Sequence, residues 1–256
     1  MIHETAIIDS SAKIADDVEI GPYSIIGADV EIDSGTWIGP HVVINGPAKI
    51  GKDNRIYQFA SIGEAPQDLK YDGEPTRLEV GDRNTIREYV TFNRGTPDGG
   101  GLTKIGSDNL FMAYAHVAHD CQVGNKIIFA NAASLAGHVH VGDQAILGGF
   151  TSVHQFTHIG EHSFSGLGTI INRDVPPFVI VAGNHAQAYG INKNGLKRRG
   201  FEADTIRALH KTFKLIVKGR KKRDEIQADL DQLIEGFDEV KTMVDFIDAS
   251  ERGIVR

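Results

Sequence analysis

Aliphatic residues recur at every sixth position through the N-terminal part of the chain. Eleven isoleucines keep one register from Ile2 to Ile62, and the register returns at Val80 and again from Ile105 to Ile159. A helix cannot use this period, because apolar positions six apart drift around its surface. The two-residue alternation of a sandwich does not keep a six-residue phase over so many repeats. A short strand and a turn can repeat in this way, so the pattern predicts a parallel β-helix with three sides to each coil.

Two segments interrupt the register. Residues 64–79 ("EAPQDLKYDGEPTRLE") and 93–104 ("NRGTPDGGGLTK") are rich in glycine, proline and charge, which predicts loops that leave the prism. Loops on a rigid scaffold commonly carry function. We therefore expect the prism over residues 1–178, with two ejected loops.

The six-residue period ends after "DVPPF" (174–178). From about Glu202 apolar residues follow a helical period in three successive segments, "DTIRALHKTFKLIV", "RDEIQADLDQLIEGF" and "EVKTMVDFIDAS". Residues 179–256 are thus expected to form a linker and a small α-helical domain. The predicted fold class is mainly β, a parallel β-helix followed by this helical domain.

Composition narrows the functional classes. The 256 residues carry a formal net charge of −7, which disfavours a nucleic-acid partner. A single cysteine, Cys121, excludes an internal disulfide and a cysteine-rich zinc cluster, and it occupies a small-residue slot of the core. The chain has no signal-like segment and no apolar run of membrane-spanning length. We expect a cytoplasmic protein without stable membrane insertion.

The stretch "AYAHVAHDCQVG" (113–124) concentrates polar chemistry on this scaffold. Three sides of six residues place positions 18 apart on successive coils, roughly 4.8 Å from each other. His119, Gly137 and Gln155 then form one column, while His138 lies one coil from Asp120.

This column suits acyl transfer. His119 is a candidate general base, Asp120 can fix its tautomer, and the N–H of Gly137 can face a developing oxyanion. No serine or cysteine stands in the column, so direct attack by a substrate hydroxyl is simpler than an acyl-enzyme. Two alternatives remain open from the residues alone. His116, His119 and His138 can be a three-imidazole zinc site, as in trimeric β-helix carbonic anhydrases, or the histidines can be solvated side chains of a purely structural solenoid.

Longer motifs show a resemblance that covers the whole chain. They are "IYQFASIGEAPQDLKYDGEPTRLEVGDRN" (56–84), "AHVAHDC" (115–121), "LAGHVHVGD" (135–143), "VHQF" (153–156) and "GNHAQAYGINKNGLKRRGF" (183–201). With them the sequence resembles the UDP-N-acetylglucosamine 3-O-acyltransferases of lipid A biosynthesis. The resemblance implies a left-handed coil, although the usual crossover rule favours the right hand. A related N-acyltransferase family carries an additional N-terminal domain, whereas here the register starts at Ile2.

The resemblance also implies a reaction and an assembly. The enzyme would be a homotrimer with sites between neighbouring prisms. It would move an R-3-hydroxyacyl chain from acyl carrier protein to the glucosamine 3-OH of UDP-N-acetylglucosamine. The donor brings its own phosphopantetheine, so no further cofactor and no metal are expected. Whether the acceptor is UDP-N-acetylglucosamine or its 3-amino analogue stays open.

Residue roles follow from the matching motifs. His119 would be the base, Asp120 its orienting acid and Gly137 the oxyanion donor. The substrate-binding residues implied are Asp68 and Lys70, reaching in from the adjacent subunit, then His116, His138, His154 and Gln155 around the sugar and acyl groups. Asn192 and Arg198 would face the nucleotide, and His185 is a further substrate-binding candidate in the matching GNHA motif.

Three further positions carry expectations. Leu167 stands where the family ends its hydrocarbon groove, and a side chain larger than glycine there implies a chain of ten to twelve carbons. Asn93 replaces a histidine common in the family, so an electrostatic role at the diphosphate is in doubt at that position. The basic runs 197–199 and 218–223 are candidate docking points for the acidic carrier protein.

Overall fold

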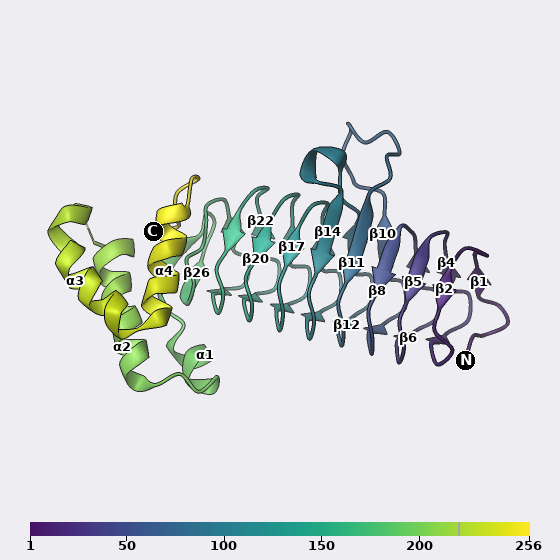
Figure 1. Ribbon diagram of the computed structural model, residues 1–256, viewed down its shortest axis with the longest axis horizontal. Coiled ribbons are helices and arrows are strands. Elements are labelled where there is room, and N and C mark those ends of the chain that lie inside the picture. Colours follow the sequence, from purple (N-terminus) through teal and green to yellow (C-terminus); the bar gives the residue numbers. More distant parts are fainter. Residues whose placement is uncertain (220) are drawn as a thin grey trace.

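The six-residue repeats fold into a long prism with three flat sides, and a helical domain closes its C-terminal end (Figure 1). The computed structural model describes residues 1–219 and 221–256. Each side is one sheet, and successive strands of the chain go to successive sides, so that strands three apart in order are hydrogen-bonded neighbours. The coil is left-handed, as the resemblance implied.

The strands are short, most of them two residues long. The nine-stranded sheet contains β1 (Ile7–Ile8), β4 (Ile25–Ile26), β7 (Val43–Ile44), β10 (Ser61–Glu64), β13 (Thr91–Asn93), β16 (His116–Val117), β19 (Ser134–Leu135), β22 (Ser152–Val153) and β25 (Ile170–Ile171). The eight-stranded sheet contains β2 (Lys13–Ile14), β5 (Val30–Ile32), β8 (Ala48–Ile50), β11 (Arg77–Val80), β14 (Leu102–Ile105), β17 (Gln122–Val123), β20 (His140–Val141) and β23 (His158–Ile159). The ten-stranded sheet contains β3 (Glu19–Ile20), β6 (Trp37–Ile38), β9 (Arg55–Ile56), β12 (Thr85–Ile86), β15 (Leu110–Phe111), β18 (Ile128–Phe129), β21 (Ile146–Leu147), β24 (Phe164–Ser165), β26 (Val179–Ala182) and β27 (Gln187–Ile191).

The repeated aliphatics fill the interior of the prism. The second residue of a strand points inward, and from Ile20 to Ile62 every isoleucine of the register is buried. Three phenylalanines, Phe92, Phe111 and Phe129, continue the core where the prism passes the ejected loops. Full burial of such a side chain contributes about 1.5–3 kcal/mol, which explains why the register tolerates so few polar exceptions.

Corner residues in the left-handed backbone region turn the chain from one side to the next. Asp120, His138 and Phe156 have φ of 60°, 61° and 61° and lie on successive coils of the corner between the nine- and eight-stranded sheets. Non-glycine residues adopt this region infrequently, and Asp, Asn and His do so more readily than most. Corner side chains point outward and stack, so the chemistry of each corner is set by residues 18 apart.

Both ejected loops leave this same corner, at the N-terminal side of Asp120 (Figure 1). Strand β10 continues to Glu64 and β11 begins at Arg77, so the first loop is 65–76 rather than 64–79. Strand β14 begins at Leu102, so the second loop is 94–101 rather than 93–104, and it contains a short 3-10 helix, η1 (Pro97–Gly99). Both loops are shorter than predicted because residues at their ends extend the parallel ladder.

The prism continues past residue 178, beyond the expected boundary. Strands β26 and β27 form an antiparallel hairpin that extends the ten-stranded sheet to Ile191. Helices α1 (Lys193–Arg198), α2 (Ala203–Thr212), α3 (Arg223–Gly236) and α4 (Asp238–Ala249) follow, and a π-helical turn, η2 (Phe213–Val217), continues α2. The three longer helices match the three periodic segments. Among the described residues, no helix combines the length and the apolarity needed to cross a membrane.

Candidate active site

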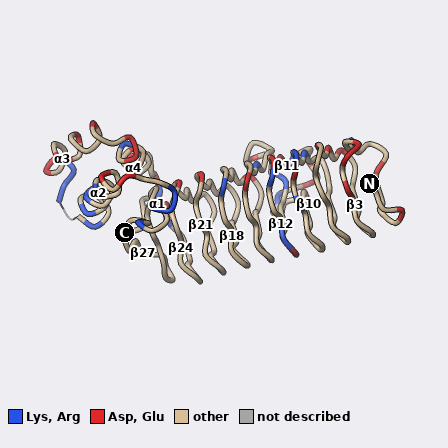
Figure 2. Tube along the Cα trace, turned by 90° about the horizontal axis from the view of Figure 1, so that it is seen from below, with Lys and Arg blue, Asp and Glu red and all other residues tan. Residues whose placement is uncertain are grey.

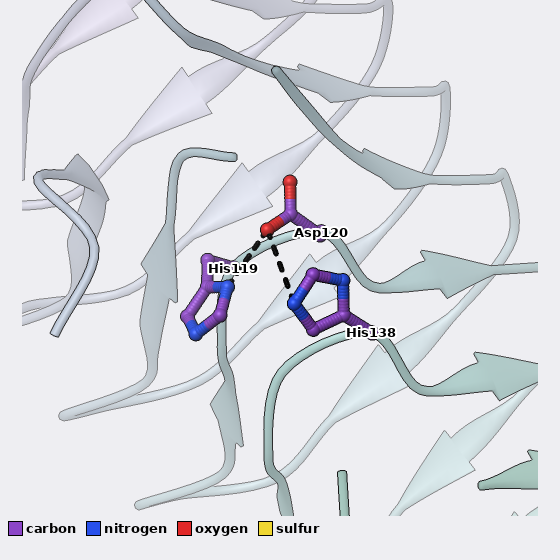
Figure 3. A group of neighbouring side chains, drawn as sticks. All are labelled: His119, Asp120 and His138. Atoms are coloured by element: carbon purple, nitrogen blue, oxygen red, sulfur yellow. Dashed lines mark hydrogen bonds and ion pairs between the residues drawn. The ribbon is translucent and has the colours of Figure 1, made fainter. Parts of the chain in front are cut away.

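The histidine and aspartate of the corner after β16 form a close pair. His119 Nδ1 lies 2.7 Å from Asp120 Oδ2, and an ionised carboxylate can only accept, so Nδ1 carries the proton (Figure 3). Within residues 1–219 and 221–256, His119 Nε2 has no hydrogen-bond partner. In the neutral ring with its proton on Nδ1, Nε2 is the nitrogen that can accept a proton, the arrangement required of a general base.

Asp120 is held by the second ejected loop as well as by His119. Thr96 donates its hydroxyl to Oδ2 at 2.6 Å and its backbone N–H to Oδ1 at 2.8 Å. The carboxyl side chain is fully buried. Burial alone raises its pKa, but the bonds from His119 and Thr96 outweigh burial and lower the pKa below its usual value. Asp120 thus stays ionised beside His119. Sequence reasoning missed Thr96, because its loop lies outside the repeat.

Gly137 lies directly against the His119 ring on the next coil. A Cβ built on Gly137 falls 2.7 Å from His119 Nε2, too close for any real side chain. The neighbouring main chain confirms the register, since the N–H of His138 donates to the carbonyl of His119 at 3.0 Å. The N–H of Gly137 finds no acceptor in the part of the chain that the structure describes. An unpaired backbone N–H on a residue that packs against the His119 ring is a candidate to stabilise an oxyanion.

His138 flanks the pair from the coil of Gly137 (Figure 3). Its ring meets that of His119 edge-on, with centroids 5.1 Å apart, and stacks on Phe156 at 4.3 Å. Burial lowers the pKa of His138, and the charges of Asp120, Asp68 and Asp98 oppose that decrease. His116 lies in β16, the strand that leads into the corner of His119, and its Nδ1 bonds Thr91 Oγ1 at 2.7 Å.

The first loop brings Asp68 and Lys70 to this region within a single chain. Asp68 Oδ1 accepts the N–H of Lys70 at 3.0 Å, and the Lys70 side chain is exposed. The negative charge of Asp68 acts to raise the pKa of His138 in the same chain. That Asp68 and Lys70 reach the site of a neighbouring subunit stays a prediction. Asn93 is buried and donates its amide to the carbonyl of Ala65 at 2.9 Å, so it supports the base of this loop.

Gln155 and His154 lie two coils above His119 and are both exposed. The C-terminal tail reaches them through Arg252, whose Nη1 donates to the carbonyl of Gln155 and lies 3.3 Å from His154 Nδ1. The sequence carries no signal for this contact, because the two segments are almost a hundred residues apart.

The remaining predicted site residues, from Leu167 to Arg198, are spread over the C-terminal end of the prism. Asn192 is buried, its side-chain oxygen caps α1 by accepting the N–H of Gly195, and its amide nitrogen donates to the carbonyl of His162. Arg198 on α1 and His185 in the β26–β27 turn are exposed. Leu167 is 78% exposed, and its Cδ1 lies 3.1 Å from a Cβ built on Gly149 one coil earlier. Leu167 is therefore not a core residue of the register.

The three-imidazole alternative is not assembled. Among the described residues, the one group of three potential metal-ligating residues is His119, Asp120 and His138, with their donor atoms within 4.8 Å of one another. His116 is not part of it. A cation there would have to displace protons that His119 and Thr96 donate to the buried Asp120 carboxylate. The donor set favours a proton-transfer pair over a metal centre.

Comparison with known proteins identifies relatives of this arrangement. Residues 174–255 match the family model described as UDP-N-acetylglucosamine O-acyltransferase, domain 2. LpxA from Acinetobacter baumannii is 49% identical over 100% of this chain and 99% of its own, with a TM-score of 0.95. The UDP-N-acetylglucosamine O-acyltransferase of Moraxella catarrhalis is 47% identical over 100% and 99% of the two chains, with a TM-score of 0.96. The Arabidopsis UDP-N-acetylglucosamine acyltransferase is 32% identical over 100% of each chain, with a TM-score of 0.87. With this identity over its full length, the chain belongs to the UDP-N-acetylglucosamine O-acyltransferase family.

Proposed function

We propose that the protein transfers an R-3-hydroxyacyl chain from acyl carrier protein to the glucosamine 3-OH of UDP-N-acetylglucosamine, the first step of lipid A biosynthesis. One observation carries the chemistry. Asp120 bonds His119 Nδ1, so the neutral ring leaves Nε2 to accept a proton, and Gly137, packed against that ring, has an N–H with no acceptor among the described residues. A base and an oxyanion donor side by side serve attack of a hydroxyl on a thioester.

The residues account for each proton in the transfer. His119 Nε2 takes the proton of the 3-OH as its oxygen attacks the thioester carbonyl. The resulting oxyanion accepts a hydrogen bond from Gly137 N–H, and Asp120 stabilises the imidazolium. When the intermediate collapses, the C–S bond breaks and His119 returns the proton to the phosphopantetheine sulfur. The products are a 3-O-ester and the free thiol of the carrier protein.

Direct transfer is favoured because, in the described part of the chain, no nucleophile is placed for an acyl-enzyme. Cys121 is buried behind the corner, where its thiol bonds the carbonyl of Ala136 and burial raises its pKa to about 12. A thiol in that state is inert. Within residues 1–219 and 221–256, no serine hydroxyl bonds His119.

The surface of helices α1 and α2 of this protein is suited to binding the acyl carrier protein. Lys and Arg gather there (Figure 2), around a 520 Å³ groove with Ile206 at its base. The cationic and imidazole side chains that line it are Lys193, Lys197, Arg207, His210, Lys211 and Lys214. Arg207 pairs with Asp204 and Lys211 lies 3.6 Å from Asp229, in exposed ion pairs that leave both cations accessible. An acidic carrier protein is attracted to such a surface on an otherwise acidic protein.

Two other predicted docking residues, Arg199 and Arg223, have partners within the chain. Arg199 turns inward to the carbonyl of Gln144 and is not available. In the run 218–223, residue 220 lies outside the described residues, and Arg223 pairs with Asp248 at 2.7 Å.

A homotrimer is supported by an exposed aromatic ladder on the corner between the ten- and nine-stranded sheets. Ring centroids 4.8–5.5 Å apart connect five successive coils through Tyr23, His41, Phe59, Tyr89 and Tyr114. Four of these rings are at least 44% exposed. A contiguous apolar surface of this kind marks a protein interface, and we place the contact between copies of the chain there.

The proposal is tested by offering the purified protein 3-hydroxyacyl carrier protein with UDP-N-acetylglucosamine or with its 3-amino analogue. We expect an alkali-labile ester from the first acceptor, formed faster than any amide from the second. Preferred amide formation would assign the protein to the amino sugar, and failure to use either acceptor would overturn the proposal.

A further inference from the structure

The second ejected loop replaces a tight corner of the prism at a critical place. Residues 94–101 connect β13 to β14 in the coil before β16, so they lie where an ordinary corner would sit beneath Asp120. The repeat continues without this insertion at every later coil of the same corner, for example from β16 to β17. The inserted loop is therefore not needed to continue the repeat.

Thr96 connects this loop to the carboxylate through two bonds of fixed direction. Its hydroxyl accepts the N–H of Gly99 at 3.3 Å, which caps η1, and its single proton therefore points to Asp120 Oδ2 at 2.6 Å. The backbone N–H of Thr96 occupies Oδ1 at 2.8 Å. With His119 on Oδ2 as well, three donors hold the carboxylate and its rotation is blocked. Thr96 is itself 4% exposed, so water does not compete for these bonds.

Two glycines let the loop approach this closely. A Cβ on Gly99 would fall on the Asp120 carboxyl group, and one on Gly95 would lie 2.8 Å from Oδ1. Neither glycine has a positive φ, so close packing requires them, at Gly99 on the carboxylate and at Gly95 on the backbone of 101–102 as well as on Oδ1.

We propose that Thr96 is a positioning residue for acyl transfer, which fixes the Asp120 carboxylate so that the Nε2 of His119 faces the acceptor hydroxyl. The proposal rests on the proposed function for its kinetic consequence. A carboxylate held only by His119 can rotate with the ring, whereas one held by Thr96 defines the ring plane and the Nδ1–H tautomer. Supporting bonds of this kind preorganise a base without touching the substrate.

The kinetic test compares Thr96→Val, which deletes the hydroxyl at similar size and keeps the N–H, with Thr96→Ser, which restores it. We expect Thr96→Val to lower kcat ~10-fold, the size of one hydrogen bond to a charged group, with KM within about twofold. Thr96→Ser should recover most of the loss. In an Asp120→Ala background, Thr96→Val should change kcat no further, because Thr96 acts through Asp120.

A matched control separates positioning from folding. Thr36 is equally buried and its hydroxyl donates to the carbonyl of Gly51 at 2.8 Å, far from the site. Thr36→Val should cost similar thermal stability and leave kcat unchanged. A wild-type kcat for Thr96→Val, or an equal additional loss in the Asp120→Ala background, would overturn the proposal.

A spectroscopic measurement tests the same point without relying on activity. Protein labelled with ¹⁵N-histidine should show His119 as the Nδ1–H tautomer, with its signal assigned by its loss in His119→Gln. Thr96→Val should convert that signal to a tautomer mixture, and an unchanged signal would contradict the positioning role. Absence of any acyl transfer by wild type would overturn the proposed function but leave this outcome decisive for Thr96.

Discussion

Replacing Leu167 by glycine should lengthen the acyl chain that the enzyme prefers. Leu167 lies in the turn between β24 and β25 and covers the space above Gly149 at the corner of the ten- and nine-stranded sheets. His119 and Gly137 lie at the opposite edge of the nine-stranded sheet. Ser134 and Ser152 pair on this sheet, so an acyl chain that started at the proposed oxyanion site and crossed the sheet would pass these small residues before it met Leu167.

The size of the effect follows from the methylenes that lose burial. A fourteen-carbon chain has two methylenes more than a twelve-carbon chain, and each contributes about 0.8 kcal/mol when buried. Excluding two of them costs about 1.6 kcal/mol, so wild type should prefer ten to twelve carbons over fourteen by at least about tenfold in kcat/KM. The side chain is 78% exposed, so its removal should cost little stability beyond the backbone entropy of glycine, about 0.5–1 kcal/mol.

Competing 3-hydroxyacyl carrier proteins of ten, twelve and fourteen carbons in one reaction measure the preference. Leu167→Gly should move it to fourteen carbons, and the volume-conserving Leu167→Met should leave it unchanged. Equal or better use of the fourteen-carbon donor by wild type, together with no gain from Leu167→Gly, would refute the assignment of Leu167 as the end of the groove.

Other residues give independent predictions. Lys70→Ala should raise KM with little change in kcat, because Lys70 is expected to bind substrate; a fall in kcat alone would contradict that role, and the exposed corner residue Lys126 provides a control. Burial, then the charge of Arg199, lowers the pKa of His162 to about 4. The unfolded chain therefore binds more protons than the folded one between about pH 6.5 and 4, so stability should be complete above this window and fall on acidification through it. The urea midpoint should drop between pH 7 and pH 5, and less so in His162→Gln; equal drops would count against the assignment. Dialysis against EDTA should leave turnover intact, whereas stoichiometric zinc whose removal stops turnover would support the metal alternative.

The spatial neighbours of residues within the repeat were predictable from the sequence, because a coil of 18 residues places residues 18 apart on adjacent coils. Steps of 18 residues placed Gly137 one coil from His119, and the structure has them in contact. The same steps explain why His138 faces Asp120. No knowledge of side-chain packing was needed for either contact.

Contacts outside the period were not predictable. Thr96 precedes Pro97 and Asp98, a pattern that indicates a helix cap, but nothing in it names Asp120 as a partner. Arg199, in a run of candidate docking residues, instead donates to the carbonyl of Gln144, and no pattern in the sequence indicates that Arg252 donates to the carbonyl of Gln155. The sequence motif around Asn192 likewise does not indicate that its side-chain oxygen caps α1. Loop paths and chain ends depend on tertiary packing, which leaves no local pattern in the sequence.

The base assigned to the reaction is tested most directly by His119→Ala in an assay with UDP-N-acetylglucosamine and a twelve-carbon 3-hydroxyacyl carrier protein. Product is quantified by mass spectrometry, and thermal unfolding verifies that the variant stays folded. Because the variant lacks the group that removes the hydroxyl proton, we expect turnover to fall by at least ~10²–10⁴-fold. Near-normal turnover by a folded His119→Ala protein would contradict general-base catalysis by His119.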